Sequence, residues 1–347
     1  MKRIHLDLGE RGYDISLGSG LLDRIDEYFN LERKVFIATD SLVPREYCEK
    51  VAKKAKNARI YTVESGEESK SISSFEKILT EMMDFGMTRG DAAVAVGGGV
   101  VGDLTGFCAS AYMRGIDFYN FPTTLLSQVD SSIGGKTAVN LGRTKNIIGA
   151  FYQPKAVVID TDVLRTLPKR QMSAGLAEVI KSSIISDASL FSLLEQNDFE
   201  TLRHNEELLG EVIAATLRIK TSVVEADERE GGLRRVLNLG HTPAHAIEKC
   251  CHNHNHGEAV AIGLNLIAQA AVKGKIMDKE EAERIDMLLA KFGFDTELPV
   301  PLAELLKAMR KDKKRNGEAI HLIVPEHIGK VKDIKLTYEE MDDFFAK

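Results

Sequence analysis

The chain has 347 residues, of which 44% are hydrophobic and 28% are charged, with a formal net charge of −6. This length allows two domains of ordinary size with a substantial buried core, and the negative balance with dispersed basic residues gives no reason to expect a nucleic-acid partner. No apolar run is long enough for a transmembrane helix, and the early basic residues are not followed by the apolar segment of a signal peptide, so we expect a cytoplasmic protein without a membrane partner.

Short apolar runs alternate with amphipathic segments in the first part of the chain. Residues 1–20 alternate in pattern and contain glycines, which predicts an antiparallel hairpin at a sheet edge. Five apolar runs predict strands at Val35–Asp40, Ala58–Val63, Asp91–Val96, Ile116–Pro122 and Ala156–Asp160. Between them, Ser73–Phe85 has the three- and four-residue spacing of a helix. This alternation predicts an α/β unit with a Rossmann-like, doubly wound parallel sheet.

The pattern changes after about residue 165, where long amphipathic stretches replace the strands. Helices are predicted at Ser173–Ser186, Asn205–Ala226, Pro243–Cys250, Glu258–Lys273, Lys279–Lys291 and Leu302–Lys311. One late strand is predicted at Ala319–Pro325. We therefore expect an α/β domain over residues 1–165 and a mainly α-helical domain over residues 166–347.

The four cysteines form neither a CxxC motif nor a disulfide framework. They are Cys48, Cys108, Cys250 and Cys251, and the adjacent pair is badly placed to bridge itself. We expect free, mostly buried thiols.

A glycine-rich segment, AVAVGGGVVGDLTGF, predicts a phosphate site. An apolar strand ends in Gly97, Gly98, Gly99 and Gly102, and a helix follows whose N-terminal N–H groups can face a pyrophosphate. A tight turn without a ligand is the alternative, because the glycines do not follow the first strand of the sheet. Asp40 closes its strand where a carboxylate can meet a ribose hydroxyl, and Glu67 and Lys70 can serve the same ligand from a nearby loop. Each of these three is, taken alone, more often a solvated charge.

A second group of residues resembles a metal site. Glu178 lies in a predicted helix, and His241, His245 and His256 lie near predicted helix starts. Thr242 is a suitable N-cap and Pro243 a suitable first residue for the helix that carries His245. One carboxylate and two imidazoles with an open position fit a catalytic zinc-type site. Structural histidines are the alternative, and the His252 and His254 run could bind metal by itself.

Charged and amide side chains also occur in apolar or glycine-rich surroundings. They are Arg114, Asp130, Lys136, Lys145, Asn146, Lys181, Lys220, Arg234 and Asn238. Several cations around one cleft suit a phosphorylated, carboxylated sugar acid, although any single one is more often an ordinary surface charge.

Together these segments resemble the 3-dehydroquinate synthase family over essentially the whole chain. The most specific blocks are GGGVVGDLTGF, YMRG, FPTTLLSQVDSSIGGKTAVN, KNIIGAF, AEVIK, DEREGGLRRVLNLGHT and HGEAVAIG. Glycerol dehydrogenase-like and iron-dependent alcohol dehydrogenases share the two-domain plan, but SSIGGKTAVN and DEREGGLR favour the sugar-phosphate cyclases. The chain departs from the common family pattern at Pro243–Ala244, where a bulky apolar residue followed by glycine is expected.

The resemblance implies a role for each matching residue. Zinc or cobalt would be bound by Glu178, His241 and His256. NAD would be contacted by Asp40, Glu67, Lys70, Gly98, Gly99, Asp103, Thr123, Thr124, Lys145 and Thr166. The substrate would be held by Arg114, Asp130, Lys136, Asn146, Lys181, Lys220, Arg234, Asn238 and His256, with Lys313 or Lys314. Catalysis would use Glu230 and His245 for proton transfer, with Asp130 and Lys136.

The implied reaction converts 3-deoxy-D-arabino-heptulosonate 7-phosphate into 3-dehydroquinate and phosphate in the shikimate pathway of aromatic amino acid synthesis. It proceeds by transient oxidation with NAD, phosphate elimination, reduction and intramolecular aldol closure, so the enzyme is a lyase. A homodimer is the family expectation. The alternatives are a cyclase that makes an inosose or a valiolone, an NAD-dependent alcohol dehydrogenase, and a non-catalytic NAD-binding sensor.

Overall fold

The computed structural model describes residues 1–142, 144–251, 253–313 and 319–346. The chain divides into two compact units, Met1–Pro168 and Lys169–Lys347, and we describe each by itself.

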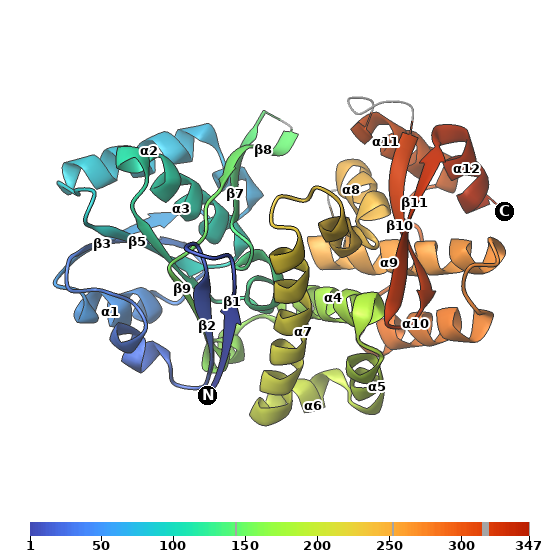
Figure 1. The fold of residues 1–347 in the computed structure, drawn as a ribbon, viewed down its shortest axis with the longest axis horizontal. Coiled ribbons are helices and arrows are strands. Elements are labelled where there is room, and N and C mark those ends of the chain that lie inside the picture. Colours follow the sequence, from blue (N-terminus) through green and yellow to red (C-terminus); the bar gives the residue numbers. More distant parts are fainter. Residues whose placement is uncertain (143, 252, 314–318, 347) are drawn as a thin grey trace. The chain divides into compact units, whose positions relative to one another are not determined.

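The first unit is built around a seven-stranded sheet in the order β1-β2-β9-β6-β5-β3-β4 (Figure 1). Its strands are β1 (Lys2–Leu6), β2 (Tyr13–Gly18), β3 (Lys34–Asp40), β4 (Asn57–Val63), β5 (Ala92–Gly97), β6 (Asp117–Pro122) and β9 (Ala156–Asp160). The β1–β2 pair is antiparallel and lies at one edge, whereas the other neighbours run parallel. The expected edge hairpin, the five strands and the Rossmann-like α/β fold are thus confirmed.

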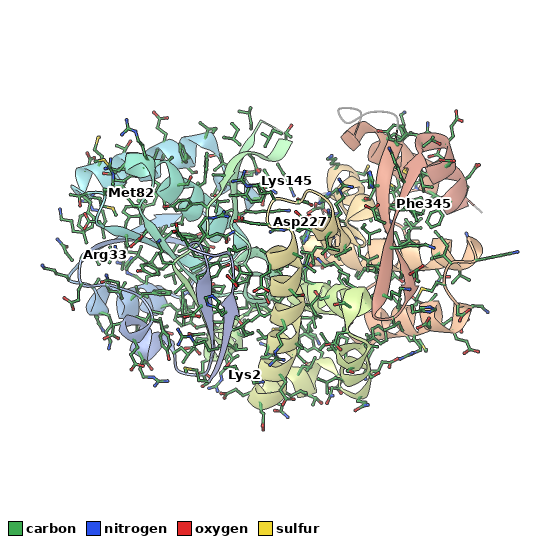
Figure 2. The ribbon with its side chains drawn as sticks, viewed as in Figure 1. Lys2, Arg33, Met82, Lys145, Asp227 and Phe345 are labelled. Atoms are coloured by element: carbon green, nitrogen blue, oxygen red, sulfur yellow. The ribbon has the colours of Figure 1, made fainter. Side chains whose placement is uncertain are left out.

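Helices cover both faces of this sheet. Successive strand residues point to opposite faces, so they pack into two different apolar clusters. On β3, Val35 and Ile37 belong to the apolar cluster that includes residues of α1 (Arg45–Lys54). Phe36 belongs to the cluster of α2 (Ile72–Asp84) and α3 (Gly99–Ala111), in which Met82 is fully buried (Figures 1 and 2). The sheet is therefore buried on both sides, as its continuous apolar runs predicted.

A separate hairpin, which was not predicted, consists of β7 (Lys136–Leu141) and β8 (Thr144–Phe151). Most of the described β8 residues are exposed, so no apolar run marked it. The hairpin lies against α3 through a close contact, since a Cβ on Gly106 would come within 2.5 Å of Thr137. The hairpin carries Lys136, Lys145 and Asn146 within the first unit.

The second unit is mainly α-helical, as expected. Its helices are α4 (Lys169–Ser186), α5 (Ala188–Gln196), α6 (Phe199–His204), α7 (Glu206–Ala226), α8 (His241–Cys250), α9 (His256–Lys273), α10 (Lys279–Lys291), α11 (Leu302–Lys313) and α12 (Tyr338–Ala346). A hairpin of β10 (Ala319–His327) and β11 (Lys330–Thr337) accompanies them (Figure 1). The late strand is confirmed, whereas β11, with its alternating charges, was missed.

Helices α4 and α9 form the centre of this unit. The middle of α4 is almost continuously buried, and most of α9 is buried too. The two backbones approach closely at Gly257, where an added Cβ would lie 2.3 Å from the Cα of Ala174. Because Ala174 lies one turn before Glu178, this contact fixes the start of α9 beside Glu178.

The four cysteines are free, with Cys48 and Cys108 buried, as expected. Among the described residues, no helix combines the length and the apolar character needed to cross a bilayer.

Candidate functional site

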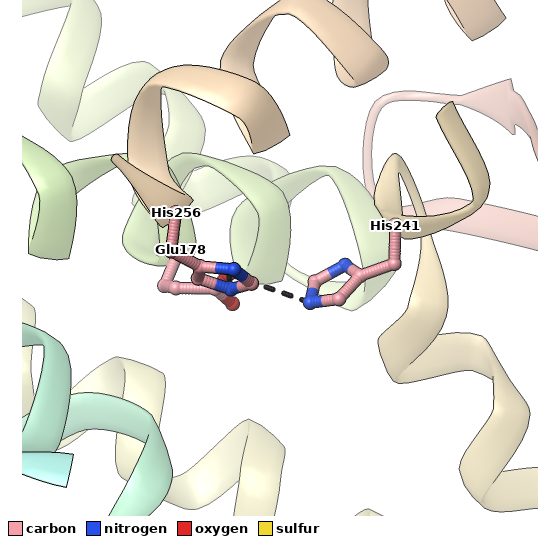
Figure 3. A group of neighbouring side chains, drawn as sticks. All are labelled: Glu178, His241 and His256. Atoms are coloured by element: carbon pink, nitrogen blue, oxygen red, sulfur yellow. Dashed lines mark ion pairs between the residues drawn. The ribbon is translucent and has the colours of Figure 1, made fainter. Parts of the chain in front are cut away.

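Three potential metal ligands meet in the second unit. Glu178 comes from the middle of α4, His241 is the first residue of α8, and His256 is the first residue of α9 (Figure 3). One ligand atom from each lies within 4.8 Å of those of the other two. The Glu178 Oε1 atom is 3.7 Å from Nε2 of His241 and 3.4 Å from Nε2 of His256. The structure therefore brings together the three residues for which metal binding was predicted.

Both histidines occupy these positions because of how their helices begin. Asn255 caps α9, and its side chain and Glu258 form a reciprocal capping box. Helix α8 begins at His241 after Gly240, which has a left-handed backbone with φ of 76°. The prediction that Thr242 caps this helix was therefore wrong. An added Cβ on Gly263 would lie 2.1 Å from the Gly240 carbonyl oxygen. The α9 backbone is therefore closely packed against Gly240, where α8 begins.

The outer nitrogen of each imidazole also has an acceptor. Nδ1 of His241 lies 3.1 Å from the carbonyl oxygen of Leu239, and Nδ1 of His256 lies 3.5 Å from Oε1 of Glu248. A proton on Nδ1 leaves Nε2 as the metal-binding nitrogen, and acceptors in this position are typical of metal-bound histidines. Leu239 and Glu248 were missed from the sequence, although Glu248 follows His241 on the same helix.

The Glu178 carboxylate is 1% exposed and pairs with the Lys181 ammonium group one turn later. Burial opposes its ionisation, but Lys181, His256 and His241 outweigh burial and hold the pKa of Glu178 well below its usual value. Oε2 of Glu178 faces Lys181, whereas Oε1 faces only the two imidazole Nε2 atoms among the described residues, at 3.7 and 3.4 Å, and accepts no hydrogen bond of normal geometry. A buried acceptor without a hydrogen bond is costly, and a cation would satisfy it. These residues therefore fit a divalent metal.

The two imidazoles have opposite protonation tendencies. Burial, followed by Lys181, lowers the pKa of His241 to about 3. Burial acts the same way on His256, but Glu178 and Glu248 outweigh it and raise the pKa of His256 to about 10. Since a metal binds neutral imidazole, it would have to displace the proton of His256.

A loop after α7 holds further predicted residues. Asp227, which follows α7 (Figure 2), accepts backbone hydrogen bonds from Gly231, Gly232 and Arg234. These bonds lower the pKa of Asp227 to about 2. Within the loop, Nδ2 of Asn238 donates to Oε1 of Glu230 at 2.9 Å. Asp227 was missed, because three residues separate it from Gly231 and its bonds to the loop N–H groups depend on the loop conformation.

Other predicted residues of this unit lie at buried or neighbouring positions. The His245 ring is perpendicular to that of His241, with centroids 5.6 Å apart. Lys220, on α7, is buried, and the buried Arg234 donates to the Glu228 carbonyl group. Lys313 is the last residue of α11, and Lys314 lies outside the described residues.

In the first unit, several predicted NAD residues follow the carboxyl ends of parallel strands, which share one edge of a sheet. Asp40 ends β3, and Thr123 and Thr124 follow β6. Gly98 is the N-cap of α3, which begins at Gly99. An added Cβ on Gly99 would lie 2.9 Å from Oγ of Ser131, so a larger residue would disturb this turn.

Another group links the first unit's loops to the β7–β8 hairpin. The buried Lys70 ammonium group pairs with Asp103 and donates to Oδ1 of Asn146 at 2.5 Å. Oε1 of Glu67 accepts from Nδ2 of Asn140 at 2.8 Å. Asn140 was missed, because nothing in the sequence distinguishes it from other strand asparagines.

The remaining residues of this unit are more dispersed. Lys136 lines a small pocket with Asp103, and Asp130 lies in the short helical segment Ser127–Ser131. Lys145 is exposed on β8 (Figure 2), and the hydroxyl of Thr166 lies 3.0 Å from that of Tyr47.

Arg114 is separated from the residues at the strands' carboxyl ends. It lies in the exposed turn Tyr112–Arg114, which precedes the amino end of β6, whereas Asp40 and Thr123 lie at the carboxyl ends of their strands.

The doubly wound sheet with a glycine turn, together with a helical unit that carries a Glu–His–His cluster, defines a class of two-domain α/β proteins with a candidate metal centre. Two family models match the chain: 3-dehydroquinate synthase N-terminal at residues 60–174 and 3-dehydroquinate synthase C-terminal at residues 175–315. The chain belongs to the 3-dehydroquinate synthase family.

Individual relatives agree with this assignment. A 3-dehydroquinate synthase of Alkaliphilus metalliredigens is 40% identical, over 99% of this chain and 98% of that protein. A structure of 2-deoxy-scyllo-inosose synthase complexed with carbaglucose-6-phosphate, NAD+ and Co2+ has a TM-score of 0.90 at 26% identity, covering 99% of this chain and 100% of that one.

A third similar protein is 2-epi-5-epi-valiolone synthase from Streptomyces hygroscopicus, whose structure has NAD+ and Zn2+ bound. Its TM-score is 0.88 at 26% identity, with 96% of each chain covered. The expected family and enzyme class are thus confirmed.

Proposed function

We propose that this chain converts 3-deoxy-D-arabino-heptulosonate 7-phosphate into 3-dehydroquinate and phosphate in the shikimate pathway. Family membership over both units supports the reaction. The observation that carries the chemistry is the buried Glu178 carboxylate facing the Nε2 atoms of His241 and His256. The reaction would comprise transient oxidation of one substrate hydroxyl, elimination of phosphate, reduction, and an intramolecular aldol step.

Glu178, His241 and His256 would hold zinc or cobalt, the metals bound in the two similar cyclase structures. The metal would supply a Lewis acid at the substrate hydroxyl. The chain's own contribution is to hold both Nε2 atoms toward Glu178 while Leu239 and Glu248 face the Nδ1 atoms.

NAD would supply the hydride acceptor and donor within one turnover. The first unit, expected as domain 1–165, would hold it at the carboxyl edge of the sheet. The residues proposed for this role are Asp40, Glu67, Lys70, Gly98, Gly99, Asp103, Thr123, Thr124, Lys145 and Thr166. The free N–H groups of α3 after Gly98 support a pyrophosphate position there.

The substrate's phosphate, hydroxyls and carboxylate need cationic and amide partners. We assign these contacts to Asp130, Lys136, Asn146, Lys181, Lys220, Arg234, Asn238, His256 and a lysine of the pair Lys313 and Lys314. The resemblance implies a contact for Arg114 as well, which lies before β6, at the opposite end of that strand from Thr123. Glu230 and His245 would transfer protons, with Asp130 and Lys136 contributing to catalysis. The Asn238 amide, which donates to Glu230, would orient that carboxylate.

The test is turnover of purified protein with the heptulosonate phosphate, catalytic NAD and Zn²⁺. We expect equal amounts of phosphate and 3-dehydroquinate, no accumulation of NADH, and loss of both products on chelation. Accumulated NADH would instead indicate an alcohol dehydrogenase. Absence of turnover in protein that binds NAD and metal would contradict the proposal and favour a sensor.

The second candidate is a cyclase that acts on an uncarboxylated sugar phosphate. The structural similarity to 2-deoxy-scyllo-inosose synthase favours testing it. Glucose 6-phosphate should therefore be assayed in parallel, and phosphate release from it alone would decide for this candidate. A homodimer and a cytoplasmic location complete the proposal, and sedimentation analysis tests the former.

A further inference from the structure

Asn140, on β7, connects the β7–β8 hairpin to the segment around Lys70. The Asn140 backbone N–H donates to the Lys70 carbonyl oxygen at 2.8 Å. Its Nδ2 donates to Oε1 of Glu67 at 2.8 Å, and its Oδ1 accepts the backbone N–H of Asn146, also at 2.8 Å. One residue thus contacts three others for which ligand roles are proposed.

The orientation of the Asn140 amide is determined by these partners. The Glu67 carboxylate can only accept and the Asn146 N–H can only donate, so one amide orientation satisfies both. Neither Ala nor Asp can replace it fully. Alanine removes both side-chain bonds, whereas aspartate keeps the acceptor for Asn146 but places a second carboxylate against Glu67.

The bond to Asn146 holds an uncommon backbone conformation. Asn146 has φ of 56°, in the left-handed region that non-glycine residues seldom adopt. In this conformation its Oδ1 receives the Nζ of the buried Lys70, which also pairs with Asp103. Asn140 therefore supports Asn146 from the backbone side while Lys70 contacts its side chain.

We propose that Asn140 is a positioning residue that couples the NAD-side residues Glu67 and Lys70 to the substrate-side residue Asn146. This inference rests on the proposed function. Asn140 would touch neither ligand, and it would act through the Glu67 carboxylate on one side and the Asn146 main chain on the other.

The experiment compares the wild type with Asn140→Ala, Asn140→Asp and the control Asn205→Ala. Asn205 likewise accepts a backbone N–H, from Leu208 at 3.0 Å, but it caps α7 in the other unit. Calorimetry gives the Kd for NAD, steady-state kinetics give kcat and the substrate KM, and thermal unfolding reports stability. A hydrogen bond to a charged group is worth about tenfold or more in an equilibrium and a neutral one about fivefold, so Asn140→Ala should weaken NAD binding about tenfold and raise KM about fivefold.

The aspartate variant separates the effect of the bond to Glu67 from the effect of the bond to Asn146. Asn140→Asp should weaken NAD binding at least as much as alanine does, while KM stays near the wild-type value because the acceptor for Asn146 remains. In Glu67→Ala protein, adding Asn140→Ala should weaken NAD binding no further, because the shared contact is already lost. Asn205→Ala should lower only the thermal midpoint.

Three results would overturn the inference. They are unchanged Kd and KM in Asn140→Ala, additive effects of Glu67→Ala and Asn140→Ala on NAD binding, and equal KM effects of alanine and aspartate. If the wild type itself neither binds NAD nor turns over, the proposed function fails together with the inference. If the wild type is active and the variants behave in one of these three ways, only the role of Asn140 is rejected.

Discussion

The His256 imidazole lies between two carboxylates, with Nε2 3.4 Å from Glu178 and Nδ1 3.5 Å from Glu248. Glu178 faces the ring nitrogen that would bind a metal, whereas Glu248 faces the opposite nitrogen and fixes the ring's orientation.

Replacing Glu248 should weaken metal binding without removing a ligand. Loss of such an outer partner costs about 10–100-fold in metal affinity, which we expect for Glu248→Ala. Glu248→Gln should lose less, since its amide oxygen still accepts from Nδ1. Competition with a chromophoric chelator measures Zn²⁺ affinity, and Glu283→Ala, at an exposed position of α10, is the control. Wild-type affinity in the alanine variant would show that Glu248 does not orient His256.

The raised pKa of His256, about 10, predicts a pH-dependent stability of the metal-free protein. Because the folded pKa lies above the unfolded value of about 6.5, this contribution is fully present below pH 6.5 and is lost as the pH rises through about 10. Metal-free His256→Gln should therefore have a lower urea midpoint than the wild type at pH 6, and the gap should close toward pH 10.

The control for this profile is His204→Gln, at the exposed end of α6, which should change the urea midpoint little at any of these pH values. A gap between His256→Gln and the wild type that stays constant from pH 6 to pH 10 would show that protonated His256 does not stabilise the fold.

The backbone contact at Gly257 predicts opposite effects for two glycine substitutions. Gly257→Ala would place a methyl group 2.3 Å from the Ala174 Cα, so we expect a loss of about 1–3 kcal/mol in the free energy of unfolding, with weaker Zn²⁺ binding. Gly210→Ala, within α7 and with open space around its Cβ position, should gain about 0.5–1 kcal/mol. Urea unfolding measures both, and equal effects would show that α4 and α9 can separate at little cost.

The sequence predicted most of the fold where apolar periodicity was strong. Strands such as Val35–Asp40 are buried on both faces, so their composition identifies them. Strands β8 and β11 carry exposed or charged residues and are specified by pairing with their hairpin partners, which no local pattern reveals. The start of α8 was misplaced because the left-handed conformation of Gly240 depends on packing.

The candidate site was predictable in its ligand types and less so in its supporting contacts. Glu178, His241 and His256 belong to residue types and blocks that carry a recognisable chemistry. Glu248 and Asn140 look like any helix or strand residue, and their importance arises only from distances such as the 2.8 Å between Asn140 and Glu67. These distances depend on tertiary packing, which periodicity does not encode.

The contact between Gly257 and Ala174 also determines how this chain can vary. Because two main chains meet there, the closest approach of α4 and α9 beside His256 is made by backbone atoms and not by the longer apolar side chains around them. Substitutions in that apolar core can therefore alter thermal tolerance while the separation of Glu178 and His256 stays the same. Chains that differ widely in their interiors can in this way keep one coordination geometry, as long as the glycine is retained.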